Sequence, residues 1–394
     1  MSYHYDRMDR LISENRDGED TSYLYDLCGN RLKKLDKSGK EEYNYNRKNQ
    51  LISRKRGGQR VVYQYDMQGN LLKAAGAEGT TSYTYNAFNQ QTAVLTADGG
   101  KLENQYDAEY LRAGTIENGE KRTFLYYNEE LLAEADQQEE PVSRYILGYG
   151  VAACRNRGKE GYHSCHQDEQ NSTVYLLGAD GEIKNAYQYD AFGVIRTSRE
   201  ELPNRILYTR QQYDQISSQY YLRARYYNPV VGRFLQEDVY RGDGLNLYVY
   251  CGNNPVVYYD PSGFSPNPLS LLNSSSRYPA NGDQSSIVQI TMTGARGSDF
   301  TAAFKKSRIK KSEAIGYTWH HEPDFDPNTG MTTMVLVKTS MHEENLPHSG
   351  SVSQYEKQFG VKYETYEAKM ISYKNKWRDK EPRQRKKKEN CKEE

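Results

Sequence analysis

The sequence predicts a mainly β protein that ends in a small α+β domain, on three observations. A motif of the form Tyr-Xaa-Tyr-Asp/Asn recurs about every 20 residues in the first part of the chain. Only 36% of the 394 residues are hydrophobic, but 37 tyrosines supply apolar surface that carries a polar end. Four of the seven histidines lie within residues 316–350, two on each side of an apolar run.

The repeated motif is typical of stacked β-hairpins. Seven units are found, with the tyrosine before Asp or Asn at Tyr5, Tyr25, Tyr45, Tyr65, Tyr85, Tyr106 and Tyr127. In each unit a short alternating run is followed by a turn with Asn, Asp or Gly and then by a second short run, which is a hairpin signal. Hairpins at so constant a spacing predict one continuous curved sheet.

These units resemble the YD repeats of the Rhs (rearrangement hot spot) and teneurin-like proteins, in which the repeats wind into a hollow β-shell. The resemblance implies a curved, shell-like sheet over residues 1–159. Seven repeats with the core segment that follows them are few for a closed cocoon. We therefore expect a chain that is a fragment of a longer protein or a displaced gene copy that lacks its delivery end.

Residues 160–264 carry a second group of motifs. They are Ala186–Gly193 (AYQYDAFG), Tyr220–Pro229 (YYLRARYYNP), Gly232–Phe234 (GRF), Asn253–Pro255 (NNP) and Asp260–Phe264 (DPSGF). This group resembles the Rhs-associated core, which plugs or closes the shell in that family. Residues 265–283 are rich in Ser, Asn and Pro and predict a linker, so residues 284–394 are expected to form a separate domain.

Two aspartates of this core are candidates for chemistry. In shell-forming relatives a pair of aspartates cuts the chain shortly after the Asp-Pro-Xaa-Gly element, and Asp238 and Asp260 match their positions. The resemblance implies autoproteolysis after Phe264, because two carboxylates that share one proton supply an acid and a base. The family usually has Pro where Val239 stands and Leu where Phe264 stands. The alternative is that both aspartates only cap turns.

The last third of the chain predicts a helix, a hairpin and a second helix. Residues 298–315 are expected to form the first helix, and the hairpin strands are expected at residues 317–321 and 331–338. Ser340 with Glu343 forms a capping box that starts a helix bearing His342 in its first turn. Residues 354–373 also have helical spacing.

The histidine segment resembles the WHH-type nuclease toxins of the HNH and endonuclease VII-like superfamily, which have a ββα-metal (His-Me) finger. The resemblance rests on Trp319-His320-His321, on the apolar run at residues 334–337, and on His342 and His348. It implies that His321 is the general base and that His320 and His342 hold one divalent ion, Mg²⁺ or Zn²⁺. His348 is a further ligand or a phosphate contact, and Trp319 is expected to pack beneath the finger.

Phosphodiester hydrolysis explains why histidines are needed here. A neutral imidazole takes a proton from water near physiological pH, and a divalent ion stabilises charge on the leaving oxygen. Neighbouring residues of a strand point to opposite faces, so His320 and His321 can serve one phosphate only where the strand gives way to a loop. The alternative is a closed structural zinc site made of the same residues.

Charge favours a nucleic-acid partner. Residues 265–394 carry 21 basic and 16 acidic side chains, and the tail from Lys374 onward carries ten basic and five acidic ones. Arg385, Lys386, Lys387 and Lys388 are the candidate phosphate contacts, since such contacts give salt-dependent, non-specific affinity. A solvated tail is the alternative.

Cysteines and hydropathy exclude other classes of protein. The five cysteines are odd in number and irregularly spaced, so no disulfide framework or CxxC zinc site follows. No apolar run approaches 18 residues, and the N-terminal residues lack a signal-peptide core, so no membrane span is expected.

The sequence therefore predicts a toxin effector: an Rhs repeat carrier with a C-terminal metal-dependent endonuclease. Its substrate would be target-cell nucleic acid, with DNA favoured over tRNA or other RNA, and its second partner a cognate immunity protein. The protein would be secreted or on the cell surface, with its C-terminal domain delivered to the target-cell cytoplasm. The alternative is a non-enzymatic surface or adhesion protein whose histidine cluster is a structural metal site.

Overall fold

The computed structural model describes residues 1–148, 151–239, 245–264, 267–268, 277–322, 324–339 and 351–382. The chain divides into two compact units, Met1–Asn267 and Pro268–Glu394. Each unit has hydrophobic clusters of its own. Within the described ranges, no helix combines the length and the apolar character that a bilayer crossing requires.

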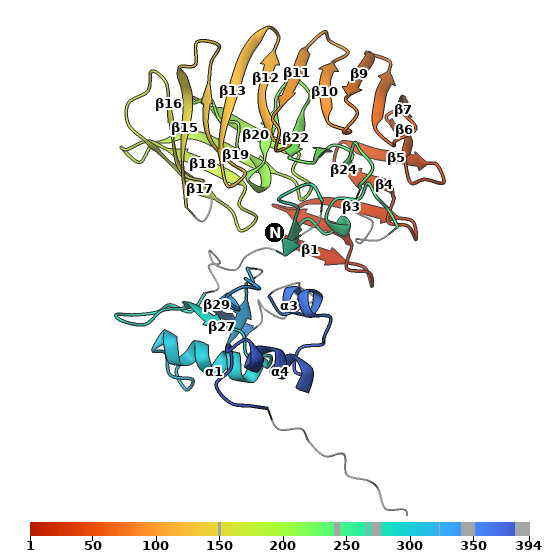
Figure 1. The fold of residues 1–394 in the computed structure, drawn as a ribbon. Helices are drawn as coiled ribbons and strands as arrows, with labels where there is room; N and C mark the ends of the chain where they lie inside the picture. The colour runs from red at the N-terminus through yellow and green to blue at the C-terminus, as the bar shows by residue number, and fades with distance from the viewer. Residues whose placement is uncertain are drawn as a thin grey trace, which may run out of the picture. The chain divides into compact units, whose positions relative to one another are not determined.

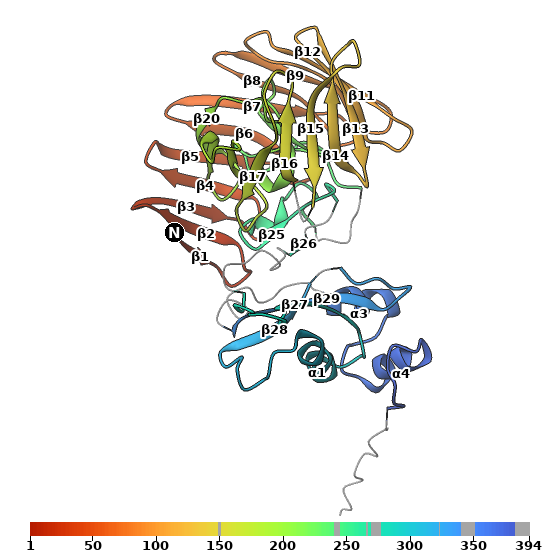
Figure 2. The same ribbon diagram turned by 90° about the vertical axis from the view of Figure 1, so that its left-hand side faces the viewer.

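The first unit is built on one antiparallel sheet of 20 strands, each paired with the next along the chain (Figures 1 and 2). The strands are β1 (Ser2–Tyr5), β2 (Leu11–Arg16), β3 (Glu19–Tyr25), β4 (Arg31–Asp36), β5 (Gly39–Tyr45), β6 (Leu51–Arg56), β7 (Gln59–Tyr65), β8 (Leu71–Gly76), β9 (Gly79–Tyr85), β10 (Gln91–Leu95), β11 (Lys101–Tyr106), β12 (Arg112–Glu117), β13 (Glu120–Tyr127), β14 (Glu130–Ala135), β15 (Pro141–Leu147), β16 (Val151–Asn156), β17 (His163–Gln167), β18 (Thr173–Leu177), β19 (Ile183–Tyr189) and β20 (Ile195–Glu200). The seven predicted repeats account for β1–β14, and the sheet continues through β20 into the range predicted as core.

The Asp or Asn of the motif closes a five-residue turn between paired strands. One carboxylate oxygen of Asp26 accepts the backbone N–H groups of Cys28 at 2.9 Å and of Asn30 at 2.8 Å. Asn46 and Asp66 cap the corresponding turns in the same way. A short acceptor side chain that bonds the backbone two and four residues on stabilises such a turn locally. The repeat period is therefore set by turn chemistry.

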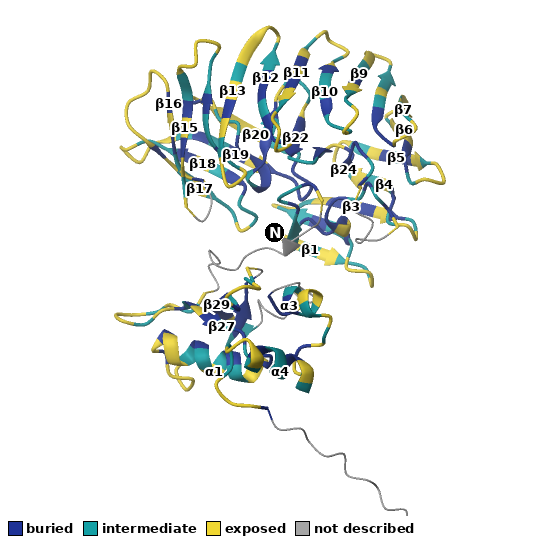
Figure 3. Ribbon diagram, in the orientation of Figure 1, coloured by how far each residue is buried: buried dark blue, intermediate teal, exposed yellow. Residues whose placement is uncertain are grey.

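The tyrosines of the motif point to one face of the sheet, because residues two apart in a strand share a face. Tyr23, Tyr43 and Tyr83 are buried, and burial alternates along the strands (Figure 3). This face packs against the core segment, which forms a four-stranded sheet with β21 (Gln212–Asp214), β22 (Gln219–Leu222), β23 (Arg225–Asn228) and β24 (Arg233–Phe234). The shorter elements of this unit are η1 (Tyr208–Arg210), η2 (Cys251–Asn253) and β25 (Tyr258–Tyr259), and β25 pairs with β26 (Asn267–Pro268).

A buried ion pair ties the curved sheet to the core segment. Arg112 on β12 lies 2.5 Å from the carboxylate of Asp214 on β21, and the two side chains are 0% and 1% exposed. The guanidinium also lies 4.4 Å from the ring centroid of Tyr221, whose hydroxyl accepts the backbone N–H of Arg112. Since such a charge is costly without its partner, this contact fixes how the core sits against the sheet.

The far ends of the sheet meet through side chains. The turn after β19 contacts β2–β4. The ring centroids of Phe192 and Tyr23 are 5.2 Å apart, and the Lys34 ammonium lies 3.3 Å from the Asp190 carboxylate. The strands beyond β14 thus bring the sheet back to its start, where the two ends meet through side chains and not through strand pairing among the described residues.

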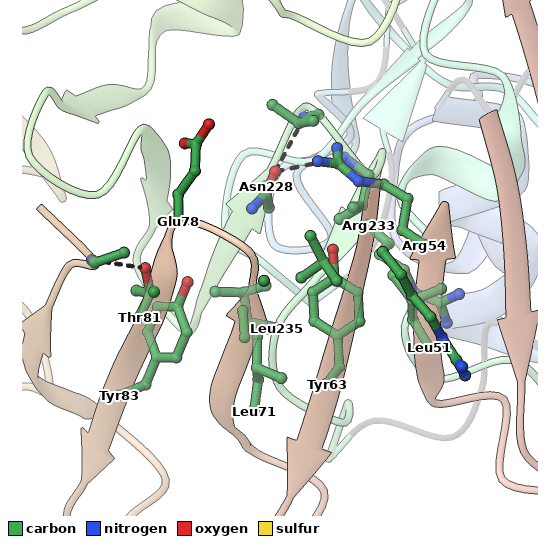
Figure 4. Close-up of a pocket in the computed structure, with 18 of the residues that line it drawn as sticks. Leu51, Arg54, Tyr63, Leu71, Glu78, Thr81, Tyr83, Asn228, Arg233 and Leu235 are labelled. Carbon is green, nitrogen blue, oxygen red and sulfur yellow. Dashed lines mark hydrogen bonds between the residues drawn. The ribbon is translucent and has the colours of Figure 1, made fainter. Parts of the chain in front are cut away.

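A cavity of about 330 Å³ remains between β6–β9 and the core segment that includes Asn228–Leu235 (Figure 4). Tyr63, Leu71, Tyr83 and Leu235 line it. The core segment thus packs against the tyrosine-bearing face of the sheet but leaves this space between them.

The second unit is α+β. Its three-stranded antiparallel sheet has the order β27 (Ile287–Thr291), β29 (Met331–Lys338), β28 (Tyr317–His321), and its helices are α1 (Arg296–Ser307), α3 (Ser351–Phe359) and α4 (Tyr366–Lys374). The overall class, mainly β with a small α+β part at the C-terminal end, is confirmed. The predicted hairpin is confirmed as β28 and β29.

The helices differ from the prediction at their ends. Helix α1 begins two residues earlier than expected and ends at Ser307, because Arg308 adopts a left-handed conformation with φ of 57°. The single helix expected at residues 354–373 is two helices, separated at Gly360 with φ of 66°. The helix expected from Ser340, with its capping box, lies outside the described residues.

Candidate active site

Strand β28 places Trp319, His320 and His321 in consecutive positions. The strand includes His321, so the loop that would bring both imidazoles to one side is not present at this point. The rings lie on opposite faces of the sheet. Trp319 and His321 face α1, where Trp319 packs edge-on against Phe304 with centroids 5.5 Å apart. Trp319 is 1% exposed, which confirms that it packs beneath the hairpin.

A buried carboxylate holds His321. Its Nε2 lies 3.1 Å from Oδ2 of Asp299, on the first turns of α1, and Asp299 is fully buried. The Tyr363 hydroxyl donates to the same oxygen at 2.7 Å. The other oxygen accepts the backbone N–H and the hydroxyl of Thr293, at 2.9 and 2.8 Å. Four hydrogen-bond contacts thus offset the cost of burying this carboxylate.

Tyr363 is fixed as a donor to Asp299. Its oxygen accepts the backbone N–H of Gly294 at 3.0 Å, which leaves its own hydrogen for the carboxylate. Burial and the adjacent Asp299 carboxylate raise the pKa of Tyr363 above its ordinary value, so the phenol stays protonated. Gly294 has φ of 78°, and a Cβ there would lie 2.7 Å from the backbone carbon of Ala368, so only glycine fits this approach.

His320 faces a second acidic side chain on the other face of the sheet. Its Nε2 is 4.0 Å from Oε1 of Glu322, and both side chains are 2% exposed. The carbonyl of Glu322 accepts the backbone N–H of Ser351 at 3.1 Å, which anchors the start of α3 beside the pair. His342 and His348, the other predicted ligands, lie outside the described residues, as do Arg385, Lys386, Lys387 and Lys388.

These donors fit part of a divalent-ion site. Imidazole nitrogen and carboxylate oxygen are both common ligands of Zn²⁺, and carboxylate oxygen suits Mg²⁺. Across the part of the chain that the structure describes, no group of three or more His, Cys, Asp or Glu side chains is placed to hold a metal. His320 and Glu322 are two such side chains, fewer than a metal site needs.

The loop between β28 and β29 is held by its own acidic residues. Asp324 accepts the hydroxyl of Thr332 and the backbone N–H of Thr333, both at 2.9 Å, and Asp326 accepts the Thr329 hydroxyl at 2.6 Å. These hydrogen bonds join the loop to the start of β29.

The two aspartates of the core lie together in the first unit. One guanidinium nitrogen of Arg225 is 2.7 Å from Asp238 and 3.7 Å from Asp260, and both carboxylates are buried. The other oxygen of Asp260 accepts the backbone N–H groups of Ser262 and Gly263, so it also caps its turn. Burial raises the pKa of Asp260. Arg225 donates to the carbonyl of Gly263, one residue before Phe264.

Comparison with known families agrees with both units. Residues 1–256 match the teneurin YD-shell family. The chain belongs to this family. Residues 310–358 of this YD-shell chain match the WHH family, described as a nuclease of the HNH/ENDO VII superfamily with conserved WHH. The resemblances to YD-repeat proteins and to WHH-type nucleases are therefore both confirmed.

Several named relatives share part of this YD-shell chain. It is 32% identical over 171 residues to the tRNA3(Ser)-specific nuclease WapA of Bacillus spizizenii, a match that covers 40% of this chain and 7% of the relative. It is 31% identical over 99 residues to the toxin protein Tse5 of Pseudomonas aeruginosa, which covers 25% of this chain and 8% of that protein. The chain thus spans less than a tenth of the length of these relatives.

Among solved structures, the crystal structure of TcdB2-TccC3 is similar, with a TM-score of 0.40 and 18% identity. The match covers 67% of this chain and 18% of that chain. Similarity at this level supports no further conclusion.

Sequence reasoning missed Asp299, Tyr363 and Glu322. Asp299 has the position of an ordinary helix-start residue, and no periodicity connects it to His321 or Tyr363. Glu322 follows the two histidines directly, and its place two residues after His320 in an extended segment was the one available signal.

Proposed function

We propose that the second unit is a metal-dependent endonuclease that hydrolyses phosphodiester bonds, and that the chain is part of a toxin effector with the YD-shell as its carrier. The observation that carries this proposal is the match of residues 310–358 to a nuclease family. Of its two adjacent histidines, His321 is hydrogen-bonded to the buried Asp299, and His320 lies 4.0 Å from Glu322. The substrate is the nucleic acid of a competing cell.

His321 is the general base in this proposal. Because Asp299 occupies Nε2, Nδ1 is the nitrogen that remains to take a proton from the attacking water. No hydrogen bond from Nδ1 to a described residue is found. The water attacks phosphorus on the side of this nitrogen.

His320 and Glu322 hold the divalent ion, together with His342, and with His348 as a further ligand or a phosphate contact. A bound ion would supply Lewis-acid stabilisation of charge on the leaving oxygen. In an in-line displacement the attacking and leaving oxygens lie on opposite sides of phosphorus. Because His321 and His320 lie on opposite faces of β28, this division of roles at one phosphate requires the end of the strand to open when substrate binds.

The closed structural zinc site remains the competing proposal, because it uses the same histidines. Cleavage of supercoiled plasmid DNA and of tRNA, each with Mg²⁺, Zn²⁺ or EDTA, separates the two. Endonuclease activity that EDTA abolishes is the expected result, and the two substrates decide between DNA and RNA. A wild-type chain that holds zinc tightly and cuts neither substrate contradicts the proposal.

The biological partners follow from a nuclease toxin. A cognate immunity protein protects the producing cell, and the second unit acts in the target-cell cytoplasm after the protein leaves its own cell. Arg385, Lys386, Lys387 and Lys388 add non-specific contacts to phosphates. The test is whether a small open reading frame follows this gene and suppresses growth inhibition by this chain when the two are co-expressed.

Self-cleavage after Phe264 is a second proposed activity, and the shared arginine favours it. Arg225 brings Asp238 and Asp260 to one nitrogen and contacts the Gly263 carbonyl beside the bond to be cut. The raised pKa of Asp260 suits a carboxyl that holds the shared proton, with Asp238 as the acceptor.

A further inference from the structure

We infer that Asp299 is the positioning residue for the base His321: it accepts Nε2–H, fixes the ring tautomer, and leaves the Nδ1 lone pair for the attacking water. This inference rests on the proposed nuclease function and adds to it a residue that the family match does not contain. The match covers residues 310–358, whereas Asp299, Thr293 and Tyr363 lie outside it on both sides.

The donors around Asp299 determine the direction of each hydrogen bond. The backbone N–H of Thr293 can only donate, so Oδ1 is an acceptor. Tyr363 receives the N–H of Gly294 and therefore gives its hydrogen to Oδ2. Oδ2 is thus an acceptor as well, and His321 Nε2 must carry the hydrogen of the 3.1 Å contact.

A neutral imidazole has only one N–H, so a proton on Nε2 leaves Nδ1 as the acceptor. The partner of one ring nitrogen sets which nitrogen is protonated, and a carboxylate in this place also orients the ring. His321 is in addition packed against Phe300, with ring centroids 5.9 Å apart. The base is therefore held in one tautomer and one orientation before substrate binds.

The structure separates this role from helix capping. Ala295 is the N-cap of α1 and makes no side-chain cap. The Asp299 carboxylate makes no bond to an N–H group within α1. Its partners are Thr293 before the helix, His321 on β28 and Tyr363 after α3. The segment just before α1 and two segments distant in sequence, β28 and the residues after α3, thus converge on one carboxylate.

Asp299→Asn is the decisive variant because its effect on the tautomer can be derived. The N–H of Thr293 requires an oxygen, so the asparagine amide must place its NH₂ group toward His321 and Tyr363. That NH₂ donates to Nε2, which forces the hydrogen of the neutral ring onto Nδ1. The variant has nearly the same shape but presents the wrong nitrogen to water.

The experiment uses the full chain labelled with ¹⁵N-histidine, and ¹H–¹⁵N correlation spectra with His321 assigned from the His321→Gln variant. The wild type should show Nε2–H at His321 and Asp299→Asn should show Nδ1–H. On whichever substrate the wild type cleaves, kcat of the variant should fall about 100- to 10,000-fold with KM nearly unchanged, as expected for loss of the correct tautomer. Asp283→Asn, at an exposed aspartate of the same unit, is the matched control and should match the wild type.

Several results overturn the inference. A wild type with Nδ1–H at His321 overturns it, even if Asp299→Asn fails to fold. A folded Asp299→Asn variant that keeps Nε2–H at His321, or that keeps the wild-type kcat, also overturns it. If the wild type and Asp299→Asn are equally active, the inference about Asp299 is wrong but the proposed nuclease function stands. A wild type that cleaves no substrate defeats the proposed function, and with it any catalytic meaning of Asp299, while the spectra still report the hydrogen-bond direction.

Discussion

Glu14 on β2 accepts a hydrogen bond at 3.1 Å from the backbone N–H of Ala191, in the turn after β19. The second oxygen of the carboxylate accepts the Tyr23 hydroxyl at 2.7 Å, so Glu14 joins the start of the sheet to its end. The side chain is 3% exposed, and burial together with the neighbouring Asp190 carboxylate raises the pKa of Glu14. An acidic group in an unfavourable setting for its charge therefore joins β2 to the turn after β19.

Glu14→Gln should make the stability of the first unit less sensitive to pH. An acid whose folded-state pKa is raised contributes stability below its unfolded pKa and loses it as pH rises through the folded pKa. As pH rises above the ordinary pKa of a glutamic acid, about 4.3, the wild type should therefore lose stability relative to the variant. Urea unfolding followed by tyrosine near-UV circular dichroism measures this. Equal pH slopes for wild type and Glu14→Gln would contradict it.

Asp214→Asn should strongly destabilise the first unit. The substitution leaves the Arg112 guanidinium, which is 0% exposed in the wild type, without its carboxylate partner. Removing one partner of a buried ion pair costs about 3–5 kcal/mol in free energy of unfolding. Glu120→Gln is the control, because its ion pair with Arg122 is largely exposed and should contribute less than about 1 kcal/mol. A similar unfolding midpoint for both variants would show that the pair does not anchor the core.

Asp260→Asn should leave the chain uncut if self-cleavage occurs. The wild type would yield a C-terminal fragment that begins at Ser265, seen on a denaturing gel and by N-terminal sequencing. Asp238→Asn should block the same cut, because the mechanism needs both carboxylates. Equal processing of either variant and the parent would end this proposal.

Glu322→Gln should weaken metal binding by at least about 10-fold, because the amide lacks the charge of the carboxylate beside His320. Equilibrium dialysis with Zn²⁺ and with Mn²⁺ as a Mg²⁺ substitute measures the affinity. Glu313→Gln, at an exposed position of the same unit, should bind as the wild type does. Unchanged affinity in Glu322→Gln would remove this residue from the ligand set.

The repeats of the first unit could be predicted because their signal is local. Asp26 and Asn30 bond within one turn, so the motif and the structure that it specifies span only a few residues. The contact of Phe192 with Tyr23 was not predicted, because it joins strands that are far apart in the sequence. The same locality made the hairpin of β28 and β29 predictable.

The surroundings of His321 could not be predicted because they are tertiary. Asp299 and Tyr363 are 64 residues apart in sequence, yet they share one hydrogen bond. The strand through His321 was predicted, but its pairing with β29 as far as this residue, which keeps His320 and His321 on opposite faces, was not. The histidines themselves pointed to phosphodiester hydrolysis. Packing against Asp299 determines which ring nitrogen of His321 is left to take a proton.

The most direct test of the account measures cleavage and metal binding together in His321→Ala and the wild type. The wild type should cut plasmid DNA or tRNA in the presence of a divalent ion and stop when EDTA is added. His321→Ala should lose about 100- to 10,000-fold in rate, as expected for removal of a general base, and bind the metal with unchanged affinity. A wild type that holds the metal but cuts neither substrate, or a His321→Ala variant that cuts as fast as the wild type, would contradict the account.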